Sequence, residues 1–325
     1  MTLCTGGHTA VMLTATQKDT AQAIVNLFET GTVLGEYGQV TVLDGDTGHL
    51  TFGRSQTTLG SGGLAKLLER YCANTRARFG ARLAPYLPRL QDKDSALDTD
   101  TRLHNLLRAS ADDSVMRDTQ DAFFDDVYWK PAQQASGRLG ISDPLGVAVV
   151  YDSFVHGSWT AMRNRTLQKT GTVDDVGQRP WVASYVATRR AWLAGHPRRD
   201  LRATVYRMDA FRRMIDRDLW GLELPLVVRG REISMAALSG TPDGCYVGPQ
   251  PGSRSLSLRA PMLRGLDVRL VQLALSGQGL DIAADGIYGR DTVRGVKAYQ
   301  AAHGLPRTGV AEPVLIVELA AQGAW

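Results

Sequence analysis

Residues 28–64 contain the stretch that decides the fold. It begins Phe28-Glu29-Thr30-Gly31, continues as Val40-Thr41-Val42-Leu43-Asp44-Gly45-Asp46-Thr47-Gly48-His49-Leu50-Thr51-Phe52, and ends Gly60-Ser61-Gly62-Gly63-Leu64. A glycine such as Gly31 is typical of a helix end, and Asp-Gly between β-branched runs is typical of a β-hairpin. Cleavage of a glycosidic bond needs one acid to protonate the leaving oxygen and a second carboxylate facing the anomeric carbon. The stretch therefore predicts a glycan hydrolase.

Outside this stretch, the hydrophobic spacing is mostly helical. Helices are expected over 16–28, 64–71, 114–134, 181–193 and 201–219, and another from Asp143-Pro144 onward. The segment 239–261 is rich in Gly, Pro and Ser, as linkers are. We expect a hydrolase domain over 1–238, a linker over 239–261 and a small binding module over 262–325. The expected fold class is mainly α (α+β), with a small β-hairpin at the cleft of the first domain.

Composition narrows the classes of function. The chain has 325 residues, which is enough for one large and one small domain, and its 43% hydrophobic content is ordinary for a globular protein. The formal net charge of +4 is a mild excess that fits attraction to an acidic polymer such as a cell wall. A nucleic-acid binder would carry a clustered basic stripe. We therefore expect no nucleic-acid partner.

Cysteine and histidine spacing argues against metals and cofactors. The three cysteines are odd in number and match no metal or redox motif. The six histidines show no HxxH or HExxH spacing, and no Walker or dinucleotide fingerprint is present. The sequence predicts neither a metal site nor a cofactor.

The N-terminus has no basic region and no sustained apolar stretch, since polar residues surround Val11-Met12-Leu13. No run approaches the ~18 apolar residues that span a bilayer. We expect a protein made in the cytoplasm without a signal peptide, which acts on the cell wall in the periplasm after delivery or release. Two settings fit: a phage-type endolysin, and an effector injected by a secretion system. The second ranks slightly ahead and implies an immunity protein or a secretion-system component as partner.

Glu29 is the leading candidate for the general acid, because it lies at a helix end beside the apolar Phe28. Asp46 is the leading candidate for the second carboxylate. Two other carboxylates in the same stretch stay open as alternatives. Glu36 precedes Tyr37-Gly38 and could serve as the acid, while Asp44 could act or could only cap the hairpin turn.

The spacing of these residues resembles the catalytic region of the glycoside hydrolase family 46 chitosanases, which belong to the lysozyme-like superfamily. The resemblance extends to Asp126-Val127-Tyr128-Trp129-Lys130-Pro131-Ala132, to Tyr151-Asp152-Ser153-Phe154-Val155-His156-Gly157 and to Ala187-Thr188-Arg189-Arg190-Ala191. It implies that Glu29 is the acid and that Asp46 and Thr51 activate water in an inverting mechanism. It also implies an ion-pair network that connects a buried aspartate and arginines to the catalytic glutamate; the matching residues are Asp152, Arg189 and Arg202.

Two positions depart from that family's pattern. Gly63 replaces an acidic substrate contact, and Gly48 replaces an arginine in the β-turn. Because chitosan is a polycation, the loss of an acidic contact weakens the case for chitosan. We therefore expect a cleft adapted to another amino-sugar polymer.

The last segment resembles the peptidoglycan-binding type 1 domain, a small three-helix module. The resemblance rests on Leu266-Asp267-Val268, Val271-Gln272-Leu273, Asp285-Gly286-Ile287-Tyr288-Gly289 and Tyr299-Gln300. Most of these positions are structural, with a turn that needs glycine's freedom at positive φ. Exposed groups near that turn, such as Tyr288 and Arg290, are the candidate wall contacts.

Three hypotheses follow. The first is an enzyme that cleaves β-1,4 amino-sugar links in peptidoglycan, a lysozyme-like muramidase tethered to the wall by its module. The second is a chitosanase whose module serves another purpose. The third is a non-catalytic wall-binding protein with a degenerate hydrolase domain, against which Glu29, Asp46 and Thr51 argue.

Overall fold

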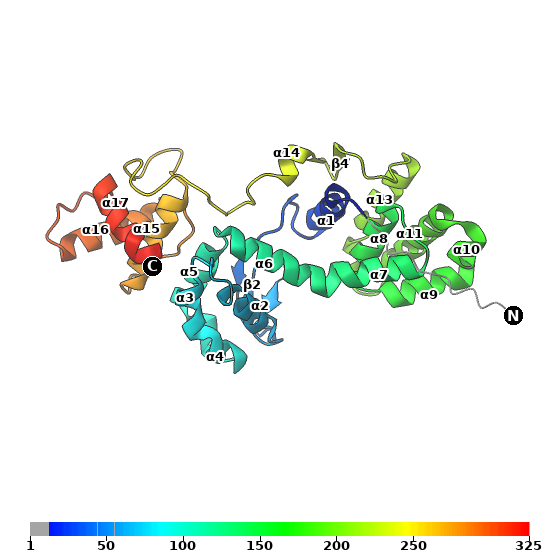
Figure 1. The fold of residues 1–325 in the computed structure, drawn as a ribbon, viewed down its shortest axis with the longest axis horizontal. Coiled ribbons are helices and arrows are strands. Elements are labelled where there is room, and N and C mark those ends of the chain that lie inside the picture. The colour runs from blue at the N-terminus through cyan, green and yellow to red at the C-terminus, as the bar shows by residue number, and fades with distance from the viewer. Residues whose placement is uncertain (1–12, 44, 55, 325) are drawn as a thin grey trace. The chain divides into compact units, whose positions relative to one another are not determined.

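The computed structural model describes residues 13–43, 45–54 and 56–324 (Figure 1). Two predictions concern residues outside this description. They are the absence of a signal peptide, which concerns residues 1–12, and the candidate carboxylate Asp44. The chain divides into two compact units, each made of two separate segments. The first unit contains Met1–Gly35 and Phe124–Gly240, and the second contains Glu36–Phe123 and Thr241–Trp325.

The first unit is built around one helix that is apolar apart from Asp152 and Ser153. Helix α8 (Pro144–Val155) is buried continuously from Leu145 to Ser153 and packs against α1 (Ala15–Glu29) and α7 (Lys130–Arg138). A helix that is apolar all round must be covered on every side, which explains its central place. The π-helical turn η3 (Asp125–Trp129), α9 (Trp159–Thr170) and α11 (Gln178–Ala194) also contact α8. The other elements of this unit are α10 (Val173–Val176), α12 (Arg199–Ala203), α13 (Tyr206–Asp216), β4 (Leu226–Val228), β5 (Arg231–Ile233) and α14 (Met235–Leu238).

Local signals fix both ends of α1. Thr14 caps the N-terminus, and Gln17 returns a hydrogen bond to the backbone of Thr14. The helix ends at Glu29, and Gly31 follows with φ of +78°. Only glycine adopts this left-handed conformation without a penalty. The chain therefore turns away directly after the candidate acid.

The second unit begins with a small antiparallel sheet in the order β1-β2-β3. Strand β1 (Val40–Thr41) pairs with β2 (Thr51–Phe52), which pairs with β3 (Thr57–Thr58); Thr41 faces Thr51, and Thr51 faces Thr58. The helices that follow are α2 (Gly63–Cys72), α3 (Gly80–Leu83), η1 (Ala84–Tyr86), α4 (Leu87–Gln91), η2 (Ser95–Thr99), α5 (Thr101–Ser110) and α6 (Ser114–Phe124).

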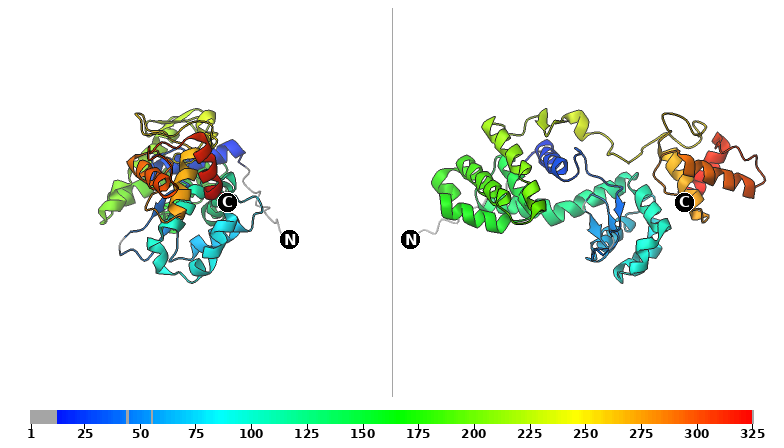
Figure 2. Two further views of the ribbon diagram at one scale, coloured as in Figure 1. Left: turned by 90° about the vertical axis from the view of Figure 1, so that its left-hand side faces the viewer. Right: turned by 180° about the vertical axis from the view of Figure 1, so that it is seen from behind.

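The C-terminal module has three helices, and the second and third of them pack on the first (Figure 2). They are α15 (Leu266–Gly277), α16 (Arg290–Ala302) and α17 (Pro313–Ala324). The predicted fold class, mainly α with a small β-sheet and a three-helix module, is confirmed. No helix in the described part of the chain has the length and apolar character to cross a membrane.

One predicted helix is wrong. The sequence pattern favoured a single helix over 201–219, whereas the chain breaks after Ala203 and starts again at Tyr206. Arg202 belongs to the short α12, and Arg207 belongs to α13. The side chains of these two arginines have different partners, namely backbone carbonyls for Arg202 and carboxylates for Arg207.

Candidate active site

Glu29 is the last residue of α1, and its helix end is held by aromatic contacts. The preceding Phe28 is buried against Phe211 and Tyr206 in edge-to-face geometry. The Tyr206 hydroxyl donates a hydrogen bond of 2.7 Å to the carbonyl of Phe28. The Glu29 side chain is 44% exposed. A fixed backbone and a solvent-accessible carboxyl group are what a proton donor to a bound polymer requires.

A buried ion-pair network contacts Glu29 through Arg207. Asp152 on α8 is completely buried, and it accepts hydrogen bonds from Arg189 Nη1 at 2.6 Å and from Arg207 Nη2 at 2.6 Å. Arg207 Nη2 also donates to Glu29 Oε1 at 2.8 Å. Arg207 therefore bridges the buried carboxylate and the candidate acid. Removal of one partner from such a buried cluster leaves an uncompensated charge, which is strongly destabilising.

The charges in this network stabilise one another. Burial alone would raise the pKa of Asp152, but the guanidinium groups of Arg207 and Arg189 outweigh it and hold that pKa below its usual value. Burial likewise opposes the charge on Arg207, yet Asp152 and Glu29 raise the pKa of this guanidinium. Asp152 and Arg207 are therefore both charged at neutral pH and form an ion pair.

His156 completes the network as a neutral group. Burial, followed by the charge on Arg207, lowers the pKa of His156 to about 4. Its Nδ1 lies 3.0 Å from Arg189 Nη2, and because an arginine only donates, Nδ1 is the acceptor. His156 thus orients Arg189 without adding a charge.

The predicted network is corrected at one position. Asp152 and Arg189 lie in the same cluster as Glu29, as the resemblance implies, but Arg202 does not. Its Nη1 donates to the backbone carbonyls of His196 and Pro197, at 2.6 and 2.9 Å. Arg207 takes the expected place instead. The burial of Arg207 could have been predicted from the sequence. Phe211 and Met214 follow it by four and seven residues, so all three side chains lie on the buried face of one helix.

In the second unit, Asp46 lies in the turn that joins β1 to β2 and is exposed. Its Oδ1 accepts a hydrogen bond from the backbone N–H of Gly48 at 3.1 Å. Thr51 starts β2 and donates from Oγ1 to the carbonyl of His49 at 3.1 Å. The backbone of the turn is packed tightly, because a side chain on Gly60 would place its Cβ 2.2 Å from the carbonyl of Thr47.

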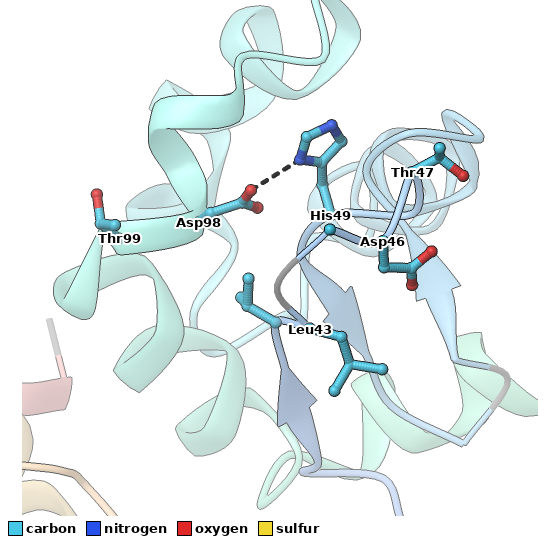
Figure 3. Close-up of a pocket in the computed structure, with 8 residues that line it drawn as sticks. Leu43, Asp46, Thr47, His49, Asp98 and Thr99 are labelled. Atoms are coloured by element: carbon cyan, nitrogen blue, oxygen red, sulfur yellow. Dashed lines mark hydrogen bonds and ion pairs between the residues drawn. The ribbon is translucent and has the colours of Figure 1, made fainter.

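Asp98 holds the same turn from η2 (Figure 3). Its Oδ2 lies 2.8 Å from His49 Nδ1, and its Oδ1 accepts the backbone N–H of Leu50 at 2.8 Å. His49 adopts a φ of +56°, which is unfavourable for a residue other than glycine. One carboxylate thus fixes both the side chain and the following backbone of a strained residue. No local sequence pattern predicts the contact between Asp98 and His49.

A hollow of about 600 Å³ lies beside Asp46. It is lined by Val42, Leu43, Gly45, Asp46, Thr47, His49, Asp98 and Thr99. The ionisable residues among these are two aspartates and one histidine, without a lysine or an arginine. The hollow therefore favours a ligand that carries positive charge or hydrogen-bond donors.

The remaining candidates have separate places. Glu36 is half-buried before β1, and Gly63 is the first residue of α2. Arg290 is exposed at the start of α16. The expectation that Tyr288 is exposed is wrong: its ring is fully buried, and its hydroxyl donates to the carbonyl of Gly309 at 2.9 Å. A buried ring is not available to a wall polymer. The described residues contain no group of three or more metal-ligating side chains.

Two family models match the sequence. The model for glycosyl hydrolase family 46 matches residues 23–226, and a model for a peptidoglycan binding domain matches residues 264–317. The chain is 31% identical over 240 residues to a chitosanase from Bacillus subtilis (strain 168), an alignment that covers 69% of this chain and 85% of the relative.

Solved structures agree with these matches. A mutant chitosanase from Bacillus subtilis MY002 complexed with 6 GlcN is 28% identical, with a TM-score of 0.54, and the match covers 67% of this chain and 96% of that one. A Gynuella sunshinyii GH46 chitosanase in complex with chitotetraose is 25% identical, with a TM-score of 0.55, over 69% of this chain and 99% of that one. Both predicted resemblances are confirmed. The chain is a glycoside hydrolase and belongs to glycosyl hydrolase family 46.

Proposed function

We propose that this enzyme is a chitosanase, which hydrolyses the β-1,4 bonds between glucosamine units. Glu29 protonates the leaving oxygen, and Asp46, with Thr51, activates the attacking water in a single inverting displacement. The observation that carries the proposal is the buried Asp152–Arg207 pair fixed on Glu29, in a chain that resembles chitosanases solved with glucosamine oligomers.

The charge beside Asp46 supports chitosan over peptidoglycan. Glucosamine carries an amino group, which the carboxylates of the hollow attract, and Asp98 in particular lies on its wall. The muramic acid of peptidoglycan carries a carboxylate, which the same groups repel. This reverses the order expected from the sequence, in which a muramidase ranked first.

Peptidoglycan hydrolysis is the second candidate. It is favoured by the match of the C-terminal module to a peptidoglycan binding domain and by Gly63, which stands where the family resemblance implies an acidic substrate contact. In either case the module holds the enzyme near an amino-sugar polymer and raises the local concentration of cleavable bonds. The proposed division remains a hydrolase domain over 1–238, a connecting segment over 239–261 and a binding module over 262–325.

Parallel digestion of chitosan and purified peptidoglycan tests the proposal. The enzyme, Glu29→Gln, Asp46→Asn and the control Glu36→Gln are incubated with each polymer, and the products are identified by mass spectrometry. We expect glucosamine oligomers from chitosan with the enzyme and the control, and none with Glu29→Gln or Asp46→Asn. If the enzyme released disaccharide-peptides from peptidoglycan and left chitosan intact, the proposal would be wrong and the enzyme would be a peptidoglycan hydrolase. Loss of activity in Glu36→Gln, with activity retained in Glu29→Gln, would move the acid role to Glu36.

A further inference from the structure

We infer that the C-terminal module is a fixed part of the unit that carries Asp46, and that it is not a domain on a flexible tether. This goes beyond the proposed function and holds for either polymer. Three independent sets of contacts within the second unit carry it: a buried amide, a buried ion pair and a shared apolar core. Each joins the module to α5 or to the turn that follows α5.

The buried amide is Asn105 of α5, which is 1% exposed. Its Nδ2 donates to Ser276 Oγ at 2.9 Å and to the carbonyl of Ile282 at 2.8 Å. Its Oδ1 accepts the backbone N–H of Ala284 at 2.9 Å. Both ends of the amide are therefore satisfied by the module. Undocking of the module would break all three of these hydrogen bonds together.

The buried ion pair joins α15 to the turn after α5. Arg269 Nε lies 3.0 Å from Asp112 Oδ2, and both side chains are nearly inaccessible to solvent. The same guanidinium donates from Nη1 to the carbonyl of Ala284 at 2.9 Å and from Nη2 to the carbonyl of Gly244. Asp112 Oδ1 accepts the backbone N–H of Tyr246 at 2.8 Å. The pair and its hydrogen bonds thus connect three parts of the second unit: residues 36–123, the connecting segment 239–261 and the module.

The apolar core is continuous across the same contact. Leucines of α5 and of α15 belong to one buried cluster, together with Ala284 and Ala320; they are Leu103, Leu106, Leu107, Leu266, Leu270 and Leu273. Every residue of α15 from Leu266 to Ser276 is buried. Helices α16 and α17 contact α15 within the module, and α5 also packs on it. An undocked module would expose this row of leucines to water.

The segment expected to be a flexible linker is held at several points. Cys245 packs with Tyr37 and Ala111 in a small buried cluster, and Tyr246 binds Asp112. Leu256 is buried and exchanges two backbone hydrogen bonds with Ala311, at 2.8 and 2.9 Å. A tether works through a broad distribution of end-to-end distances. A segment pinned on both sides has no such freedom, so a polymer bound by the module is held at a fixed position relative to the Asp46 turn.

Hydrogen–deuterium exchange on the full chain tests the inference without using activity. In the wild type, α5 and residues 282–286 are expected to be protected to a similar degree. Asn105→Ala is expected to increase exchange in both segments and to leave α8 unchanged. The milder Ser276→Ala, which removes one hydrogen bond, is expected to act in the same direction. Asn164→Ala, at an exposed site on α9, is the matched control and is expected to change nothing in the module.

Independent behaviour of the module would overturn the inference. It would be shown by rapid exchange of residues 282–286 in the wild type beside a protected α5. It would also be shown by Asn105→Ala affecting α5 alone. A second readout compares hydrolysis of a soluble glucosamine hexamer with hydrolysis of polymeric chitosan. Docking predicts that Asn105→Ala loses activity several-fold on the polymer only, whereas a flexible tether predicts equal activity on both.

Discussion

Each compact unit buries an aspartate against arginine, Asp152 against Arg189 and Arg207 in the first unit and Asp112 against Arg269 in the second. Asp152 accepts well-aligned hydrogen bonds from two guanidinium groups, and its pKa is held low. Asp112 forms an ion pair with Arg269, whose Nε approaches Oδ2 without the alignment of a hydrogen bond, and burial raises the pKa of Asp112 to about 6.

The difference shows that burial and pairing compete, and that the number of aligned donors decides the outcome. In the first unit the pairing wins, so a permanent charge stands behind Glu29. In the second unit burial wins, so the contact between α5 and the module contains a group that titrates near neutral pH. One cluster supports chemistry, and the other supports docking.

The largest effect is expected when the Asp152 cluster is broken. Asp152→Asn leaves Arg189 buried without a counter-charge and leaves Arg207 with Glu29 alone, which costs about 3–5 kcal/mol of unfolding free energy. Activity on chitosan should be lost as well, because Arg207 no longer has its second partner. Urea unfolding and product release measure the two effects. The control Asp209→Asn removes a partly exposed pair with Arg190 and should cost no more than about 1 kcal/mol. Equal costs for the two variants would contradict the comparison.

The next effect concerns the contact to the acid. Arg207→Lys keeps a positive charge but loses the planar fork that reaches Asp152 and Glu29 together. We expect kcat on glucosamine oligomers to fall roughly 10²-fold, with little change in KM, because misplacement of a catalytic group affects the chemical step. Arg202→Lys serves as the control, since Arg202 binds only carbonyls, and its kcat should not change. A rise in KM alone would place Arg207 in substrate binding.

The two clusters should respond to pH in opposite directions. Asp112 has a pKa of about 6 when folded and an ordinary value of 3.8, so its contribution to unfolding free energy falls as pH rises from about 4 to 6. The shift corresponds to at most about 3 kcal/mol. His156 has a pKa of about 4 when folded and an ordinary value of 6.5, so its contribution falls as pH drops through this interval.

Thermal unfolding between pH 4 and 7 separates these contributions. Relative to the wild type, Asp112→Asn should gain stability at pH 7 compared with pH 4.5, because the unfavourable ionisation is removed. His156→Gln should gain stability at pH 4.5 compared with pH 7. If the stability of the wild type and of both variants changed with pH in the same way, neither Asp112 nor His156 would have the shifted pKa described.

The smallest effect tests the corrected position in the module. Tyr288→Phe removes one buried hydrogen bond to Gly309 and should cost about 1 kcal/mol. Binding to purified peptidoglycan, measured by co-sedimentation, should stay unchanged because the ring is buried. Arg290→Ala changes an exposed residue and is the matched comparison. If Tyr288→Phe no longer co-sedimented with peptidoglycan although its stability was unchanged, Tyr288 would be a wall contact after all.

Much of the fold was predictable because its signals are local. The helix end at Glu29, the hairpin from Val40 to Phe52 and the helix that starts at Pro144 each depend on residues close together in the sequence. Asp152 was expected as a buried acid because the family resemblance implies one at this position. The three-helix module followed from a dense pattern of leucines and turn glycines.

The errors have a common physical cause, which is that tertiary contacts decide them. The choice between Arg202 and Arg207 depends on a break at residues 204–205 that helical spacing does not reveal. Tyr288 lies in a turn, where aromatic residues are commonly exposed, but the chain near Gly309 covers it. The Asp98–His49 contact joins residues 49 positions apart, so no local pattern indicates it.

The central claim is that Glu29, supported by Arg207 and Asp152, is the acid in an inverting hydrolysis of a glucosamine polymer. Proton NMR of the anomeric signals during hydrolysis of a glucosamine hexamer tests it most directly. The account predicts that the α-anomer appears first with the wild type and that Glu29→Gln releases no product. Initial release of the β-anomer, or undiminished release by Glu29→Gln, would contradict it.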